Sequence, residues 1–192
     1  MIRPRTFEPH PSPLVAILAG LVGTILATAI AFGAPVVGAP IIDVPLLIGG
    51  LLTRDAGAAF VVGAVIHFIG GTLVIPFVVA RVWPRLPGGA HGLAAAAVKG
   101  VVAGLALFVV TGLLLPAVGA LNSLVGDALP KPGFFALGHG VAGLFTLLVS
   151  QVAYGLALTV IIDTPRGIEP LGTLGWGGYS AAVTPDPEGK GL

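Results

Sequence analysis

The chain is dominated by long apolar runs that polar residues interrupt only at intervals. Four of these runs exceed the length of about 20 apolar residues that a helix needs to cross the hydrocarbon core of a bilayer. They occupy residues 14–38, 57–80, 93–118 and 133–162. Lipid offers no partner to backbone groups, so helices are expected, and the runs lack the alternation of membrane β-strands. The pattern predicts an all-α integral membrane protein, a four-transmembrane-helix up-down bundle over residues 1–162.

Two segments depart from this pattern. The apolar part of residues 40–55 is too short to span and is interrupted by Asp43 and Pro45, so a short interfacial or re-entrant segment is expected. Residues 163–192 are rich in Pro, Gly and Thr and predict a polar cytoplasmic tail. The first run follows a basic start that resembles a signal peptide, but it is longer than the usual signal core of about 7–15 residues. We therefore expect it to be a retained helix.

Composition supports a lipid environment and excludes several kinds of chemistry. Only 9% of the residues are charged, whereas soluble domains carry about 25%. The net charge of +1 gives no reason to expect nucleic acid as a partner. The chain has no cysteine, which excludes disulfides, thiolate metal sites and cysteine nucleophiles. The expected partners are membrane lipid and a larger membrane-protein complex.

The basic residues predict how the chain is oriented. Six Lys and Arg residues fall in the N-terminal segment, the loop between spans two and three, and the tail. Only Arg54 and Lys131 fall on the other side, so the positive-inside rule places both termini in the cytoplasm of a multi-pass protein. Lys99, in the third span, is close enough to the cytoplasmic side to snorkel to the headgroups, and Trp83 is expected in the aromatic belt.

Small and weakly polar residues recur along the spans at helical spacing. Membrane helices pair through close packing and interhelical hydrogen bonds, because lipid removes the hydrophobic drive between them. The residues expected to mediate helix packing are Gly20, Thr24, Gly63, Gly71, Gly100, Gly104, Gly143, Ser150, Gln151 and Tyr154. Gly100 and Gly104 form a GxxxG motif. Such stripes predict a bundle without naming a partner.

Two histidines within the spans are the candidate cofactor-binding residues. His67 lies in the middle of span two, and His139 lies between two glycines in span four. Either is a candidate haem ligand, and His67 is alternatively a proton-relay group or a neutral histidine bonded to a neighbouring helix. A depth offset of about 6 Å between them argues against one haem bridging both. No cofactor is predicted from the residues, although haem at His67/His139, or lipid or quinone at a subunit seam, remain alternatives.

The remaining groups give no sign of catalysis. The sequence has no Ser-His-Asp or HExxH pattern, and no Walker or Rossmann fingerprint. No carboxylate falls within a span, which argues against a proton-coupled pump built from this chain alone. We therefore expect no catalytic residues, no metal site and no enzyme activity of the chain by itself.

Residues 57–155 resemble an uncharacterised family of small four-span membrane proteins. The resemblance rests on Gly63, His67-Phe68, Gly71, Pro76-Phe77, Leu86-Pro87-Gly88 and Tyr154-Gly155. Genes of that family often lie beside those of haem-copper oxidases. The resemblance therefore implies a non-catalytic accessory subunit of a respiratory complex, a haem-copper terminal oxidase, in the prokaryotic inner (plasma) membrane. The chain departs from the family at Gln151, where a histidine is frequent.

The first hypothesis is accordingly a subunit that stabilises an oxidase core by lateral helix packing. The alternatives are a small haem-binding electron carrier that uses His67 or His139, and an oligomeric channel or transporter.

Overall fold

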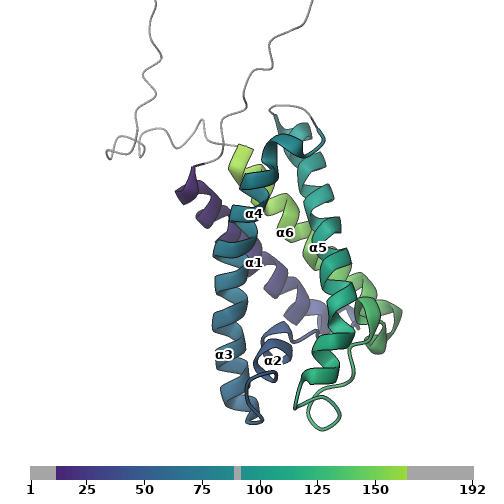
Figure 1. The fold of residues 1–192 in the computed structure, drawn as a ribbon. Helices are drawn as coiled ribbons and strands as arrows, with labels where there is room; N and C mark the ends of the chain where they lie inside the picture. The colour runs from purple at the N-terminus through teal and green to yellow at the C-terminus, as the bar shows by residue number, and fades with distance from the viewer. Residues whose placement is uncertain (1–11, 89–91, 164–192) are drawn as a thin grey trace, which may run out of the picture.

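The computed structural model describes residues 12–88 and 92–163 (Figure 1). Their secondary structure is helical, and they contain no β-strand beyond one isolated bridge between Val125 and Leu129. Four helical stretches are long and apolar enough to cross a membrane. They are Pro13–Val37, Ala56–Arg85, Leu93–Leu121 and Phe134–Asp163. The prediction of an all-helical chain with four membrane-length helices is confirmed, whereas the predicted tail lies outside the described residues.

Within these stretches the regular elements are shorter. They are α1 (Pro13–Gly33), η1 (Ala34–Val37), α2 (Val44–Gly49), α3 (Ala56–Ile69), η2 (Gly70–Val74), α4 (Ile75–Val82), η3 (Trp83–Arg85), α5 (Leu93–Leu121), η4 (Phe134–His139) and α6 (Gly140–Asp163). Three helices begin at a side chain that accepts a hydrogen bond from the first turn. Ser12 caps α1, Asp43 caps α2 and Asp55 caps α3.

The bundle is built on two close helix pairs. α5 and α1 each pack along α6, while α3, η2 and α4 form one continuous column that contacts α1 and α2. The start of α1 and the end of α6 lie at the same end of the molecule, and α2 lies toward the opposite end (Figure 1). The amide of Gly92 donates to the Asp163 carboxylate at 2.7 Å, which joins the start of α5 to the end of α6.

Glycines make the close approaches possible. A Cβ on Gly104 would lie 2.6 Å from the carbonyl oxygen of Gln151, and Gly100 and Gly155 lie directly against the facing helix. On the other side of the bundle, Gly63 of α3 faces the carbonyl of Pro45 in α2. At Gly104, Gly155 and Gly63 the nearest facing atoms belong to the backbone, so no side-chain rearrangement makes room for a larger residue.

The second span differs from its predicted extent. It continues to Arg85, so Pro76 lies well inside it and not near its end. The ring of Pro76 has no N–H and would collide with the carbonyl four residues back in a regular helix. The chain instead forms a π turn at Gly70–Val74, in which the amide of Ile75 donates to the carbonyl of Gly70. Such turns absorb an extra residue and frequently mark functional sites.

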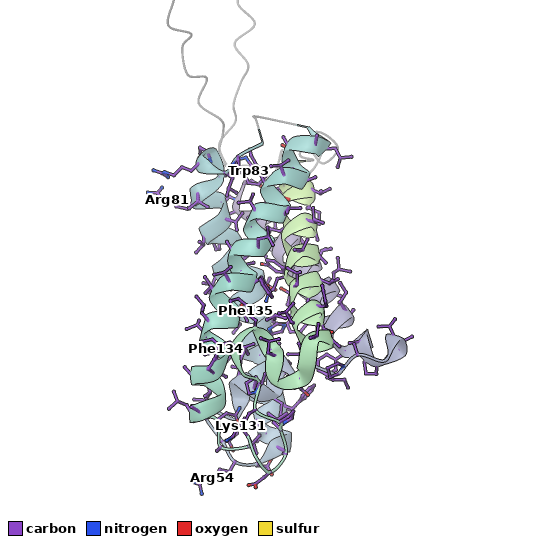
Figure 2. The ribbon with its side chains drawn as sticks, turned by 90° about the vertical axis from the view of Figure 1, so that its right-hand side faces the viewer. Arg54, Arg81, Trp83, Lys131, Phe134 and Phe135 are labelled. Atoms are coloured by element: carbon purple, nitrogen blue, oxygen red, sulfur yellow. The ribbon has the colours of Figure 1, made fainter. Side chains whose placement is uncertain are left out.

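The fourth span is not one continuous α-helix over residues 133–162. Its first part, η4, contains two non-glycine residues in the left-handed region, Phe135 with φ 52° and Ala136 with φ 61°. Figure 2 shows Phe134 and Phe135 nearer the middle of the molecule than Lys131, which lies toward its end. The segment therefore enters the bundle, turns sharply and starts α6 at Gly140.

Two further expectations are wrong. Lys99 does not snorkel outward, because its side chain is only 1% exposed and its Nζ lies 4.3 Å from the centre of the Trp83 ring. Trp83 is likewise buried, at 3% exposed, and not free to line a headgroup belt. An ammonium over an indole face gains a cation–π interaction that is strongest when both groups are desolvated.

Candidate functional site

A cavity of about 360 Å³ lies inside the bundle. Its walls come from α1, α2, α3, the π turn, α5 and α6. Ligand pockets in proteins usually enclose about 300–1,000 Å³ and combine an apolar lining with a few polar groups. Most lining side chains here are aliphatic, and no Asp, Glu, Lys or Arg contributes to the wall within the described residues.

The first polar group of the wall is the pair formed by Thr28 and His67. The Thr28 hydroxyl lies 3.0 Å from Nε2 of His67, joining α1 to α3 across the cavity wall. Both side chains are half-buried. The predicted histidine thus has a hydroxyl partner on another helix, and a hydroxyl can either donate to or accept from an imidazole nitrogen.

The second polar group is Tyr154, and the π turn explains its role. The amide N–H of Ile75 donates to the carbonyl of Gly70. The next residue, Pro76, has no N–H that could donate to the carbonyl of Gly71. The Tyr154 hydroxyl donates to that carbonyl at 2.6 Å. A carbonyl left without a backbone partner by the proline is therefore satisfied from α6.

The third polar group is Gln151 with Thr111. Nε2 of Gln151 donates to the Thr111 hydroxyl at 3.4 Å, a long bond between α6 and α5. A carboxamide offers two N–H donors and one acceptor oxygen, and a hydroxyl adds one donor. Among the described residues, no partner is found for Oε1 of Gln151 or for the Thr111 proton. This pair has more unused hydrogen-bonding capacity than the other polar groups of the wall.

The other two hydroxyls of the wall are committed to their own helices. Thr24 donates to the carbonyl of Gly20 at 2.7 Å, and Ser150 donates to that of Thr146 at 2.7 Å. These intrahelical bonds are a common way to place Ser and Thr in an apolar helix.

The structure brings six of the predicted site residues to this cavity. They are Thr24, His67, Gly71, Ser150, Gln151 and Tyr154. Five others lie at backbone contacts: Gly20 beside Pro76, Gly63 beside Pro45, Gly100 and Gly104 against α6, and Gly143 beside Ala136. The sequence reading missed Thr28 and Thr111. Thr28 follows Thr24 by one helical turn, a spacing that places both on one face.

His139 is not part of the cavity wall. It ends η4, and its Nε2 is buried without a hydrogen-bond partner within the described residues. The two histidines therefore do not share a cavity. Nor does any group of three or more His, Cys, Asp or Glu in the described segments have the arrangement of a metal site.

The short segment after α1 also contributes to the wall. Ile42 and Leu47 are almost fully buried, and both line the cavity together with Pro45. Its helix, α2, packs on α3, and Asn122 donates to the Leu47 carbonyl at 2.7 Å. Residues 40–55 were predicted as an interfacial or re-entrant segment, and their burial favours the re-entrant form.

Comparison with known proteins gives no further assignment: no protein-family model, curated protein or solved structure matches the chain.

Proposed function

We propose that this membrane protein binds a small, largely apolar molecule in its central cavity and has no catalytic role of its own. The observation that carries the proposal is the cavity itself, with its aliphatic lining and its three polar groups. A void of this size in a packed interior forfeits many van der Waals contacts, so an occupant that fills it stabilises the fold.

The route into the cavity is proposed to be lateral. Ile66 of α3 and Leu114 of α5 line the cavity and are 40% and 56% exposed. α3 and α5 do not pack extensively on each other, which leaves an opening between them. Since both helices belong to membrane-length stretches, this opening faces lipid, and an apolar molecule dissolved in the bilayer reaches the cavity without crossing water.

Native mass spectrometry of the protein in mild detergent tests this function. The wild-type chain should retain a small molecule that is lost when the opening is filled by Gly70→Phe. A Cβ on Gly70 meets no atom within 4 Å, and Gly70 lies one turn after Ile66 on the cavity wall, so the ring has room. Gly33→Phe is the matched control, because Gly33 has equally open surroundings away from this cavity. Equal retention by all three proteins would contradict the proposal.

A second proposal concerns the role implied by the family resemblance, an accessory subunit of a respiratory complex such as a haem-copper oxidase. Only 17% of the most apolar part of Ala56–Arg85 is buried, compared with 44% for Phe134–Asp163. Phe60, Val65 and Phe77 are among its exposed side chains. Such a face favours lateral packing against another membrane subunit as well as contact with lipid. Co-purification with haem-containing subunits in mild detergent would support this role, and purification as a haem-free chain under those conditions would oppose it.

The proposed orientation accompanies both roles. Arg81 lies at one end of the bundle, while Arg54 and Lys131 lie at the other (Figure 2). The end with Arg81 is proposed to face the cytoplasm, since the predicted excess of Lys and Arg falls on that side.

A further inference from the structure

The polar groups of the cavity define what kind of molecule it takes, an inference that rests on the proposed function. We infer that the ligand is an uncharged lipid-soluble molecule with one hydroxyl or carbonyl head group, which Gln151 and Thr111 bind near the middle of the membrane.

The composition of the cavity wall indicates that the ligand is uncharged. The described residues place no basic or acidic side chain there, and the hydroxyls of Thr24 and Ser150 are bonded within their helices. An ionised head group taken from water into such surroundings would lose its solvation without gaining a counter-charge. Fatty-acid carboxylates and phospholipid head groups are therefore excluded from the cavity.

The side chain of Gln151 indicates that the ligand has a polar head group. The residue lies near the midpoint of α6 and is half-buried, and Thr111 is the one hydrogen-bond partner found for its side chain among the described residues. Its bond to Thr111 is 3.4 Å long and leaves the amide oxygen and a second N–H unused. An unpaired amide in a lipid environment is costly, so a partner is expected. A hydroxyl satisfies it as donor and acceptor, and a carbonyl accepts from the N–H groups of Gln151 and the proton of Thr111.

The other polar groups of the cavity wall are less available to hydrogen-bond a ligand. The Thr28 hydroxyl and the imidazole of His67 are bonded to each other at 3.0 Å, and the Tyr154 proton is used by Gly71 at 2.6 Å. The head group is therefore assigned to the side of the cavity between α5 and α6. The apolar part lies toward α1 and α3 and leaves through the opening between Ile66 and Leu114.

Three photoreactive probes with the same hydrocarbon chain test the inference. Each carries a diazirine close to one end, and that end is a primary alcohol, an ionised carboxylate or a methyl group. The alcohol should label cavity-lining peptides of α5 and α6 about fivefold more than the methyl probe, the effect of one buried hydrogen bond, and the carboxylate should label them least. In Gln151→Leu, labelling by the alcohol should fall to that of the methyl probe.

Two controls separate the head-group assignment from folding. Thr146→Val removes a hydroxyl of α6 that is bonded to Ala142 and lies outside this cavity, so it should leave the labelling unchanged. Thr111→Val should reproduce the loss seen in Gln151→Leu, which provides a second route if the first variant does not fold.

The outcomes distinguish the two proposals. Equal labelling by the alcohol and the methyl probe, or labelling that persists in both Gln151→Leu and Thr111→Val, overturns the head-group assignment and leaves the cavity as a binding site. Labelling by the carboxylate at the level of the alcohol overturns the inferred absence of charge. If no probe labels the cavity peptides, the proposed function falls together with the inference.

Discussion

The hydrogen bond from Tyr154 to the Gly71 carbonyl should stabilise the fold, because Pro76 leaves that carbonyl without a backbone donor. Tyr154→Phe removes only the hydroxyl and keeps the ring that packs on Gly23 of α1. The Gly71 carbonyl then loses its donor at 2.6 Å, and neither Ile75, bonded to Gly70, nor Pro76, without an N–H, replaces it.

The magnitude follows from the surroundings of this carbonyl. Interhelical hydrogen bonds in membrane proteins contribute about 0.6 kcal/mol on average and about 1.7 kcal/mol at most. This bond lies at the upper end, because its acceptor is left unsatisfied and buried, which costs about 1–3 kcal/mol. We expect Tyr154→Phe to lower the free energy of unfolding by about 1.5 kcal/mol, roughly a tenfold change in the unfolding equilibrium.

A double-mutant cycle with Pro76→Ala tests the cause of this effect. Alanine restores an N–H at residue 76, so the Gly71 carbonyl gains a backbone donor in either the π or the α register. Reversible unfolding in mixed micelles should then show that Tyr154→Phe costs less than about 0.5 kcal/mol in the Pro76→Ala background, a coupling of about 1 kcal/mol. The packing energy that is lost with the proline ring is the same with and without Tyr154→Phe, so it cancels in the cycle. A cost that is equal in the two backgrounds would refute the reasoning.

Three other predictions concern packing, the buried charge and topology. Gly104→Leu should destabilise the fold by about 3 kcal/mol or prevent folding, because a Cβ there would lie 2.6 Å from the backbone of α6. A variant that is monodisperse on gel filtration and as stable as the wild type in the unfolding assay would contradict this. Trp83→Leu should lower the free energy of unfolding by about 2 kcal/mol in the same assay, because it removes the ring under the ammonium of Lys99. Adding Lys99→Met to this variant should restore part of the lost free energy of unfolding. Since the chain has no cysteine, Arg54→Cys and Arg85→Cys report topology directly: a membrane-impermeant maleimide should label them from opposite faces, and labelling from one face would exclude the proposed orientation.

The sequence was sufficient for properties that depend on length and composition. Four apolar runs predicted four membrane-length helices, because the hydrocarbon core imposes a minimum length regardless of tertiary structure. The small-residue rows also anticipated contacts: Gly100 and Gly104 lie against α6, and Gly63 lies against α2. Small residues carry this information because they are the positions at which two backbones can approach.

The features that shape the cavity depend on contacts between distant segments and were not predictable in the same way. Pro76 is visible in the sequence, but the donor to the Gly71 carbonyl in the π turn beside it is Tyr154, which follows far along the chain. The burial of Lys99 depends on the rotation of two helices that brings it over Trp83. Hydropathy reports how apolar a helix is but not how it is turned about its axis.

Two short segments pack into the bundle near the cavity: α2 with the residues before it, which lines the cavity, and η4, which does not. α2 and η4 meet there in one cluster, in which Ile42 and Leu47 pack with Ala136, Leu115 and Leu147. Irregular backbone at membrane depth is tolerated only where protein covers it or where it lines a cavity, and Ala136 is fully buried.

The left-handed residues show how strongly η4 is held in that position. Left-handed backbone at a non-glycine residue costs about 1–2 kcal/mol, so Phe135 and Ala136 require compensating contacts. The Phe135 ring supplies them by lying against Gly112 and 5.1 Å from the ring of Phe108, both in α5. α2 packs on α3 and also contacts α5, whereas η4 packs on α5 and α6. α2 thus contacts both helices that border the proposed lateral opening, and the strained η4 is held against one of them, α5.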